Sequence, residues 1–497
     1  MPTMYPGTAV PEWTAADGMP HHDNPAVSSV ALEFGRLRTV GDYLAVRDNG
    51  LIPGRKYTDT QIGGTEARMH FQGIQRCNPP NDDVLLLTGG DPADAVSHLF
   101  VCRLASRPKG RAWGTNLRFS RKPPDSDGLV HIYALDRKMW HAGGMSLLGD
   151  LLVLPLEGDP DDGSRVDFFD VTDPFDVRRF PEPLCIHRPK DVGKGGAVAL
   201  TRLPNQHYLC GVWTDSDHLP RRLDLYLSVD TNLLHGFRPE LLSWQADRML
   251  PAGGPNVAYQ TISFVIQRDG AMFLIGTENT SATSPYVRGD DRVDLLHIEF
   301  SPETTHAAAP VLTMPTVTRI AEKNVACERD FANLDAAGGI MIAPDWSADG
   351  EEAEGRLSLY AAYHWRIARC IRFIEFSQDT PITAAAIEDT ERGWIDLFEH
   401  PNFRGQRLTV SGTLDAAIPD YGSIFVQDSG FSDRVSSVRY QLPQGVTYRL
   451  YRDDQYRPKK SQNVPLEGDG MVHEIRDLQA EADFDNTISS SKYDGTG

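Results

Sequence analysis

A five-residue pattern that recurs along the chain decides the fold class. It reads Arg165-Val166-Asp167-Phe168-Phe169 and returns as Arg222-Leu223-Asp224-Leu225-Tyr226, Arg292-Val293-Asp294-Leu295-Leu296 and Arg356-Leu357-Ser358-Leu359-Tyr360, with a degenerate copy at His98-Leu99-Phe100-Val101. Polar and apolar residues alternate in each copy, as a half-buried strand requires. The copies start 57 to 70 residues apart, and such a spacing indicates a repeated structural unit.

Two further strands precede each copy in the same order. The nearer one is an apolar run that reaches an acidic residue: DVLLLTGGD to Asp91, LLVLPLEG through Glu157, YLCGVWTD to Asp215, MFLIGTEN through Glu278 and GIMIAPD to Asp345. The earlier one contains small or polar residues and starts at His70, His141, Lys194 and Gln260, with a fifth copy near 331–335. We expect it to be innermost, where strands crowd an axis.

A unit of three or four strands that returns five times is typical of a β-propeller blade. The predicted fold is therefore all-β: a five-bladed β-propeller, with six blades left open, closed by a strand from residues 30–47. Stacked β-sandwich domains are the alternative. Frequent Gly (43) and Pro (34) leave little room for long helices, which agrees with either architecture.

Composition excludes several classes of protein. The formal net charge of the 497 residues is −20, so a nucleic-acid partner is not expected. Mean hydropathy is −0.37, and no run approaches the roughly 20 apolar residues of a membrane-spanning helix. The six cysteines form no C-x-x-C pair. The first residues lack the basic and apolar regions of a secretory signal, so a cytoplasmic protein is expected, with secretion by an unmarked route left open.

The last hundred residues contain a hairpin motif. Residues Phe398 to Gly405 follow the pattern aromatic-x4-aromatic-x-Gly, in which the glycine is expected to adopt positive φ. This pattern is the hairpin signature of the βγ-crystallin family, which this part of the chain resembles. A second copy, Tyr451 to Pro458, has proline in place of the glycine, which puts the geometry of that hairpin in doubt. The resemblance implies two Greek keys, at 392–441 and 445–494, packed as a double Greek-key sandwich.

The same family has a calcium-binding motif, (Asn/Asp)-(Asn/Asp)-x-x-(Ser/Thr)-Ser. It is intact at 485–490, and a near copy at 432–437 has Ser432 in the first position. The resemblance implies Ca²⁺ ligands in two sets: Asp485, Asn486, Thr487 and Ser489 with the carbonyl of Glu399, and Asp433, Arg434 and Ser436 with the carbonyl of Arg452. Few carboxylates contribute, so modest affinity is expected. Serine-rich turns that no longer bind metal are the alternative.

The predicted propeller gathers polar residues at one channel mouth. In adjacent antiparallel strands, the start of one lies beside the end of the next. The candidate site residues are therefore His70, His141, Asp91, Glu157, Asp215, Glu278 and Asp345, with Lys194 and Gln260 nearby. Carboxylates with two histidines could bind a metal or perform acid/base chemistry. Alternatively, these polar residues only cap turns or contact water.

These observations divide the chain into a flexible segment 1–29, a propeller 30–385, a linker 386–392 and a crystallin-like domain 393–497. The main functional hypothesis is a calcium-binding protein whose propeller presents a site for a small-molecule or glycan ligand. The alternative is an enzyme, a glycan hydrolase or lyase, with its active site at the mouth. A purely structural protein would leave the propeller unexplained.

Overall fold

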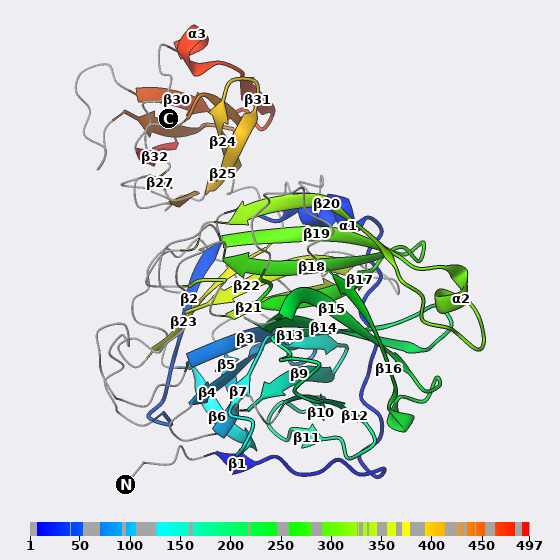
Figure 1. The fold of residues 1–497 in the computed structure, drawn as a ribbon. Helices are drawn as coiled ribbons and strands as arrows, with labels where there is room; N and C mark the ends of the chain where they lie inside the picture. The colour runs from blue at the N-terminus through cyan, green and yellow to red at the C-terminus, as the bar shows by residue number, and fades with distance from the viewer. Residues whose placement is uncertain are drawn as a thin grey trace.

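The computed structural model describes most of the chain. The described residues are 7–39, 41–52, 70–91, 96–105, 126–158, 163–216, 219–245, 258–279, 291–325, 327, 332–334, 337–344, 355–363, 370–377, 393–412, 425–426, 429–430, 435–442, 444–452, 463–482 and 490–496. They form an all-β protein whose larger part is a β-propeller (Figure 1). No helix found in these ranges has the length and apolar character needed to cross a membrane.

The strands pair with their neighbours in sequence, in antiparallel groups. The first group contains β3 (His70–Arg76), β4 (Val84–Asp91), β5 (Val96–Leu104) and β6 (Asp127–Asp136). The second contains β7 (His141–Ala142) and β8 (Ser146–Leu148) beside β9 (Leu151–Glu157), then β10 (Ser164–Asp170), which pairs with both β11 (Arg178–Arg179) and β12 (Cys185–Arg188).

The third and fourth groups are regular four-stranded sheets. The third contains β13 (Ala197–Arg202), β14 (Tyr208–Ser216), β15 (Leu219–Ser228) and β16 (Phe237–Gln245), with the short helix η2 (Leu233–His235) before β16. The fourth contains β17 (Thr261–Ile266), β18 (Met272–Asn279), β19 (Asp291–Glu299) and β20 (Thr316–Val325), with α2 (Pro302–Thr305) before β20. In both groups the recurring Arg-apolar-Asp pattern lies on the third strand.

The fifth group closes the ring with a strand from the start of the chain. It contains β21 (Ala337–Pro344), β22 (Gly355–Ala362) and β23 (Cys370–Phe376), and β23 pairs with β2 (Asp42–Arg47). In Figure 1 the blue β2 lies beside the yellow β23. The predicted closing strand is thus present, but only over 42–47, because residues 30–36 form helix α1 (Val30–Arg36). Val30 and Phe34, four residues apart, are the buried side of that helix.

The fifth group differs from the predicted strand order. The pattern placed an innermost strand near 331–335, but the strand parallel to β3 is β21, with Gly338 opposite Gly73. The run that was predicted as a second strand is therefore innermost, and the Arg356 copy lies on the second strand, β22. An alternating pattern reports which residues face the core, and it does not report the strand's distance from the axis.

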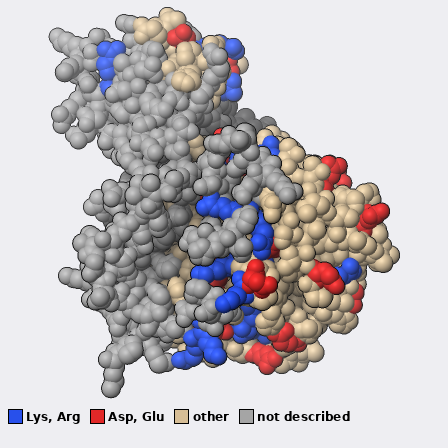
Figure 2. Space-filling view, viewed as in Figure 1, with Lys and Arg blue, Asp and Glu red and all other residues tan. Residues whose placement is uncertain are grey.

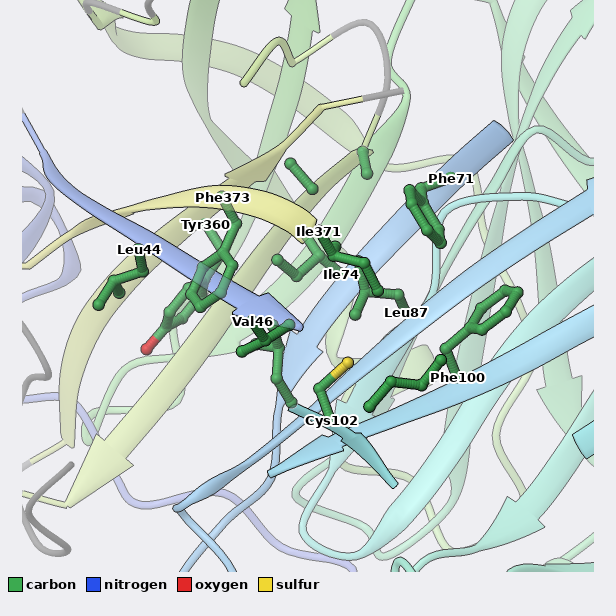
Figure 3. Close-up of a cluster of buried hydrophobic side chains, with 14 of the residues drawn as sticks. Leu44, Val46, Phe71, Ile74, Leu87, Phe100, Cys102, Tyr360, Ile371 and Phe373 are labelled. Carbon is green, nitrogen blue, oxygen red and sulfur yellow. The ribbon is translucent and has the colours of Figure 1, made fainter. Parts of the chain in front are cut away.

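Buried side chains fill the junction where the ring closes. Leu44 and Val46 of β2 lie in one hydrophobic cluster with Phe71 and Ile74 of β3 and with Phe373 of β23 (Figure 3). Strands from both ends of the propeller chain therefore share a core, and burying each such side chain contributes roughly 1.5–3 kcal/mol.

The innermost strands approach one another too closely for larger residues. The Gly144 N–H donates to the Gly196 carbonyl at 2.9 Å, and a Cβ atom at Gly144 would lie 2.0 Å from the Gln260 carbonyl oxygen. A Cβ at Gly339 would lie 1.6 Å from the Ile74 oxygen. Only glycine fits at these positions, because the innermost strands crowd around the axis, as the sequence predicts.

Residues 7–29 are bound to the propeller, which differs from the predicted flexible segment. β1 (Thr8–Ala9) pairs with β6, and the backbone N–H of the buried Trp13 donates to the Arg179 carbonyl at 2.7 Å. Farther on, the carbonyl of Ala26 accepts from Gly355 at 2.7 Å, and that of Val27 accepts from Arg268 at 2.9 Å. Buried apolar residues such as Trp13 and Val27 anchor this segment, drawn in dark blue in Figure 1.

The C-terminal strands form a lobe of their own (Figure 1). One sheet has the order β25 (Arg404–Gly412), β24 (Gly393–His400), β28 (Ser437–Gln441) and β31 (Val472–Ile475); another has β30 (Asn463–Glu467), β29 (Val446–Tyr451) and β32 (Ser490–Thr496). β26 (Phe425–Val426) pairs with β27 (Ser429–Gly430), and α3 (Leu478–Ala482) follows β31. Ile395, Leu397 and Tyr448 belong to the core of this lobe.

Candidate active site

One edge of the propeller brings together the starts of first strands and the ends of second strands. His141 of β7 is the backbone partner of Glu157 of β9, and Thr261 of β17 is the partner of Thr277, next to Glu278. We call this edge the mouth edge. Residues 7–29 contact the propeller elsewhere, near the starts of β9 and β22 and the end of β17, which lie at the opposite edge.

The predicted site residues divide into three sets. His141, Glu157 and Glu278 lie at the mouth edge with described side chains. His70, Asp91 and Asp215 belong to strands that meet this edge, but their side chains lie outside the described part. Asp345 also lies outside the described residues; the strand before it, β21, runs parallel to β3 and ends at Pro344, on the edge opposite the mouth edge.

Glu157 lies between two potential cations. Its Oε2 atom is 3.4 Å from Nδ1 of His141 and 3.7 Å from Nζ of Lys194. Glu157 and His141 belong to the second group, whereas Lys194 precedes β13 of the third, so the cluster joins two neighbouring groups. The Glu157 carboxyl is almost buried, and the two cations are more exposed.

Glu278 occupies the same place on the fourth group but is fully buried. Its Oε2 accepts the backbone N–H of Ala258 at 2.7 Å, and its Oε1 accepts from the Arg292 guanidinium. Burial raises the pKa of Glu278 to about 7, against the opposing effect of Arg292. A carboxyl group of this kind exchanges protons near neutral pH, which suits general acid catalysis.

The recurring Arg and Asp of the third strands form ion pairs near the same edge. Nε of Arg165 lies 2.6 Å from Oδ1 of Asp167, and Nε of Arg222 lies 2.8 Å from Oδ1 of Asp224. In the fourth group, Nη2 of Arg292 is 3.3 Å from Oδ2 of Asp294. Residues two apart on a strand share a face, which explains why the pattern repeats both side chains together.

The buried aspartates also bind side chains from outside the third strands. Asp224 pairs with Arg188 of β12 at 2.8 Å, and the side chains of both residues are fully buried. Asp294 accepts the hydroxyl of Tyr259 at 2.8 Å, and burial is the main cause of the raised pKa of Asp294. The sequence pattern singled out Asp224 and Asp294 as strand residues only, because the partners Arg188 and Tyr259 are distant in sequence.

Lys and Arg side chains lie close together on one part of the surface, although the net charge of the chain is −20. Figure 2 shows Lys and Arg gathered in a band at the centre of this view, with a few Asp and Glu among them. Two of the carboxylates that the sequence predicted at the mouth also have basic neighbours. For Glu157 and Glu278 those neighbours are Lys194 and Arg292.

The predicted calcium ligands are largely outside the described residues. This applies to Asp433, Arg434, Asp485, Asn486, Thr487 and Ser489, and only the backbone of Glu399 is described. Ser436 is buried and donates its backbone N–H to the Phe398 carbonyl at 2.8 Å. Arg452 follows β29.

The folded hairpin next to these positions is described. The Ser437 hydroxyl donates to the His400 carbonyl at 2.7 Å and accepts the N–H of Phe403 at 3.0 Å. Positive φ occurs at Asn402 (59°) and Phe403 (57°), before the glycine to which the sequence assigned it. Because Ser437 is hydrogen-bonded to the hairpin on both sides, it holds these two residues in a conformation that side chains rarely adopt.

Comparison with known proteins gives structural matches only. No protein-family model and no curated protein matches the chain. A GH32 β-fructofuranosidase from Bombyx mori is 13% identical with a TM-score of 0.39, covering 86% of this chain and 91% of its own. An exo-β-1,3-galactanase from Clostridium thermocellum is 10% identical with a TM-score of 0.31 (83% and 76% covered). A sucrose-6-phosphate hydrolase from Lactobacillus gasseri is 11% identical with a TM-score of 0.32 (86% and 88% covered).

These matches correct the main functional hypothesis. The prediction that the protein is primarily a calcium-binding protein is wrong, since the similar structures are carbohydrate hydrolases and agree better with the enzyme alternative.

Proposed function

We propose that the protein is a carbohydrate-cleaving enzyme, a hydrolase, with its active site at the mouth edge of the propeller. The observation that carries this proposal is a pair of glutamates at equivalent strand ends in different environments. Glu278 is buried, and its pKa is raised to about 7. Glu157 lies beside Lys194 and His141.

The two environments support two chemical roles. Glycoside hydrolysis needs a carboxylic acid that protonates the leaving oxygen and a carboxylate that activates water or attacks the sugar. Glu278 would be the acid, because burial keeps its proton to near-neutral pH. Glu157 would be the carboxylate, because the ammonium group of Lys194 lies 3.7 Å from its Oε2 and would balance a negative charge there.

The remaining polar residues would position these groups. Arg292 contacts Glu278 and Asp294 together, which fixes the orientation of the acid. His141 is in ring contact with Trp140, whose centroid is 5.4 Å away. His141 would hydrogen-bond the carboxylate or a sugar hydroxyl, and Trp140 offers an aromatic surface beside it.

We also infer the finer architecture. The five antiparallel groups are best described as five blades, supported by the parallel contact of β21 with β3. The C-terminal lobe is proposed to be a double Greek key of βγ-crystallin type. Support comes from β31, which follows β29 and β30 in the chain yet pairs with β28 of the other sheet, and from the hairpin that Ser437 holds.

The function is tested by hydrolysis of a panel of p-nitrophenyl glycosides and unsubstituted oligosaccharides, including fructans and galactans. Glu278→Gln and Glu157→Gln should each lower kcat/KM by roughly 10²–10⁴-fold, the usual effect of removing a general acid or base. Wild-type kcat should also fall as pH rises above about 7, when Glu278 loses its proton.

Glu299→Gln is the matched control. Glu299 lies at the end of β19 in the same group and is exposed, so its replacement should leave turnover unchanged. If Glu278→Gln and Glu157→Gln hydrolyse the substrate as fast as wild type, the mouth edge is not the active site. An equal loss in the control would show a non-specific effect on the fold.

A further inference from the structure

Three side chains of different chemical types converge on the outer side of the second strand group. Nε2 of His187 is 2.8 Å from Oε1 of Glu182 and 3.8 Å from Sγ of Cys185. Their potential ligand atoms all lie within 4.8 Å of one another. Glu182 and His187 are exposed, and Cys185 is half-buried.

The local backbone explains this convergence. Cys185 and His187 are two residues apart on β12, so their side chains point to the same face. A turn precedes the strand, in which the Leu184 N–H donates to the Pro181 carbonyl at 3.1 Å. The Cys185 N–H donates to the Pro183 carbonyl at 2.8 Å, and Glu182 lies inside the turn that the first bond closes, directly before the strand.

The spacing fits a tetrahedral metal ion. With Zn–S near 2.3 Å and Zn–N near 2.05 Å, a tetrahedral angle separates sulfur and nitrogen by about 3.6 Å. The observed Sγ–Nε2 distance is 3.8 Å. Oε1 of Glu182 is 2.8 Å from Nε2 of His187, and it must move outward to about 3.3 Å from that atom to bind the same ion. Glu182 and His187 have 63% and 66% exposed side chains, so this rotation meets little resistance.

Charge also favours a divalent cation here. A thiolate and a carboxylate together balance a charge of +2. The next carboxylate, Asp167, lies 3.6 Å from Sγ of Cys185 but is already paired with Arg165 at 2.6 Å and Arg179 at 3.1 Å. Since those two guanidinium groups balance its charge, Asp167 would accept hydrogen bonds beside the site and need not be a ligand.

We propose that Glu182, Cys185 and His187 form a Zn²⁺ site with the fourth position open to water. Mixed sulfur, nitrogen and oxygen ligands suit zinc, whereas Ca²⁺ and Mg²⁺ prefer oxygen alone. The site uses none of the residues of the proposed active site. Each proposal can therefore fail without the other.

Zinc binding is tested on the full chain, reduced and freed of metal with a chelator, by equilibrium dialysis against buffered Zn²⁺. Wild-type protein should bind one more Zn²⁺ than Cys185→Ser and His187→Gln, or bind it at least about a hundredfold more tightly, since even the loss of a residue that only supports a ligand costs 10–100-fold. Co²⁺ in place of zinc should give a thiolate charge-transfer band that Cys185→Ser lacks.

Two controls separate this site from non-specific binding. His235→Gln removes an exposed histidine that pairs with Asp230 at 2.7 Å, a pair that lies on the third strand group. Cys370→Ser removes a partly buried thiol on β23. Both should bind zinc as wild type does. Equal affinity in wild type, Cys185→Ser and His187→Gln, or a Co²⁺ spectrum without the thiolate band, would overturn the proposal.

Discussion

The substitution Glu278→Gln measures what it costs to bury a charge at the mouth edge. Glutamine has nearly the same shape as protonated glutamic acid and stays neutral at every pH. It retains an acceptor oxygen for the Ala258 N–H or for Arg292, the two groups that contact Glu278. Compared with the protonated acid, the change therefore removes the ability to ionise and little else.

The magnitude follows from the pKa of Glu278, which burial raises from 4.5 to about 7. Each tenfold change in proton affinity corresponds to about 1.4 kcal/mol, so ionising Glu278 in the folded state costs about 3 kcal/mol. The folded carboxyl holds its proton more tightly than the unfolded one. Its contribution to stability is thus fully present below pH 4.5 and is lost as pH rises through 7.

Glu278→Gln should therefore be as stable as wild type near pH 4.5 and more stable by up to about 3 kcal/mol at pH 8. Urea unfolding at several pH values, followed by tryptophan fluorescence, measures the difference. Trp213 is a suitable probe because it is buried and its ring centroid is 4.7 Å from that of Tyr259, which bonds Asp294. The exposed Glu299→Gln control should show no such pH dependence.

A variant that is several kcal/mol less stable than wild type at pH 8 would refute this reasoning. In that case the contact between Glu278 and Arg292 would stabilise the fold, as buried pairs do when the loss of one partner leaves a charge uncompensated. Glu278 would then be a structural residue. The assignment of a general acid would fail with it.

Other substitutions test the packing and the remaining buried groups. Asp224→Asn should destabilise the propeller by about 3–5 kcal/mol in urea unfolding, because it leaves the fully buried Arg188 without its charged partner. Gly144→Ala should prevent normal folding, judged by circular dichroism, since its Cβ would lie 2.0 Å from the Gln260 oxygen. Gly35→Ala in helix α1 should raise stability by about 0.5–1 kcal/mol, because a Cβ there would have no other atom within 4 Å. Burial lowers the pKa of His98 to about 4, so wild type should lose up to about 3 kcal/mol as pH falls from 6.5 to 4, and His98→Gln should lose less.

The sequence predicted the strand repeat because alternation of polar and apolar residues is a local property. Copies at Arg165, Arg222 and Arg292 lie on third strands with their aspartates beside them. The Arg356 copy has the same alternation but lies on a second strand, and no local signal distinguishes the two places. Helix α1 was missed because Val30 and Phe34 were interpreted as strand residues, although their spacing of four is that of a helix.

The candidate site was predictable only to the level of which strand ends meet. Antiparallel pairing brings His141 beside Glu157, and that much follows from strand order. The contacts that give the carboxylates their chemistry come from distant residues. Lys194 approaches Glu157 from the next strand group, and Ala258 reaches Glu278 from the segment before β17. The spacing of residues along the sequence does not indicate that these pairs are in contact.

The difference between Glu157 and Glu278 shows how equivalent positions acquire unequal chemistry. Both follow an apolar second strand, and the sequence treats them alike. At Glu157 the nearest groups are the partly exposed His141 ring and the exposed Lys194 ammonium, both beside the same carboxylate oxygen. At Glu278 a backbone N–H and one guanidinium replace water altogether, and burial outweighs their attraction, so the pKa rises to about 7. A repeated fold supplies the same position several times, and what surrounds each copy determines whether the carboxyl group there keeps its proton near neutral pH.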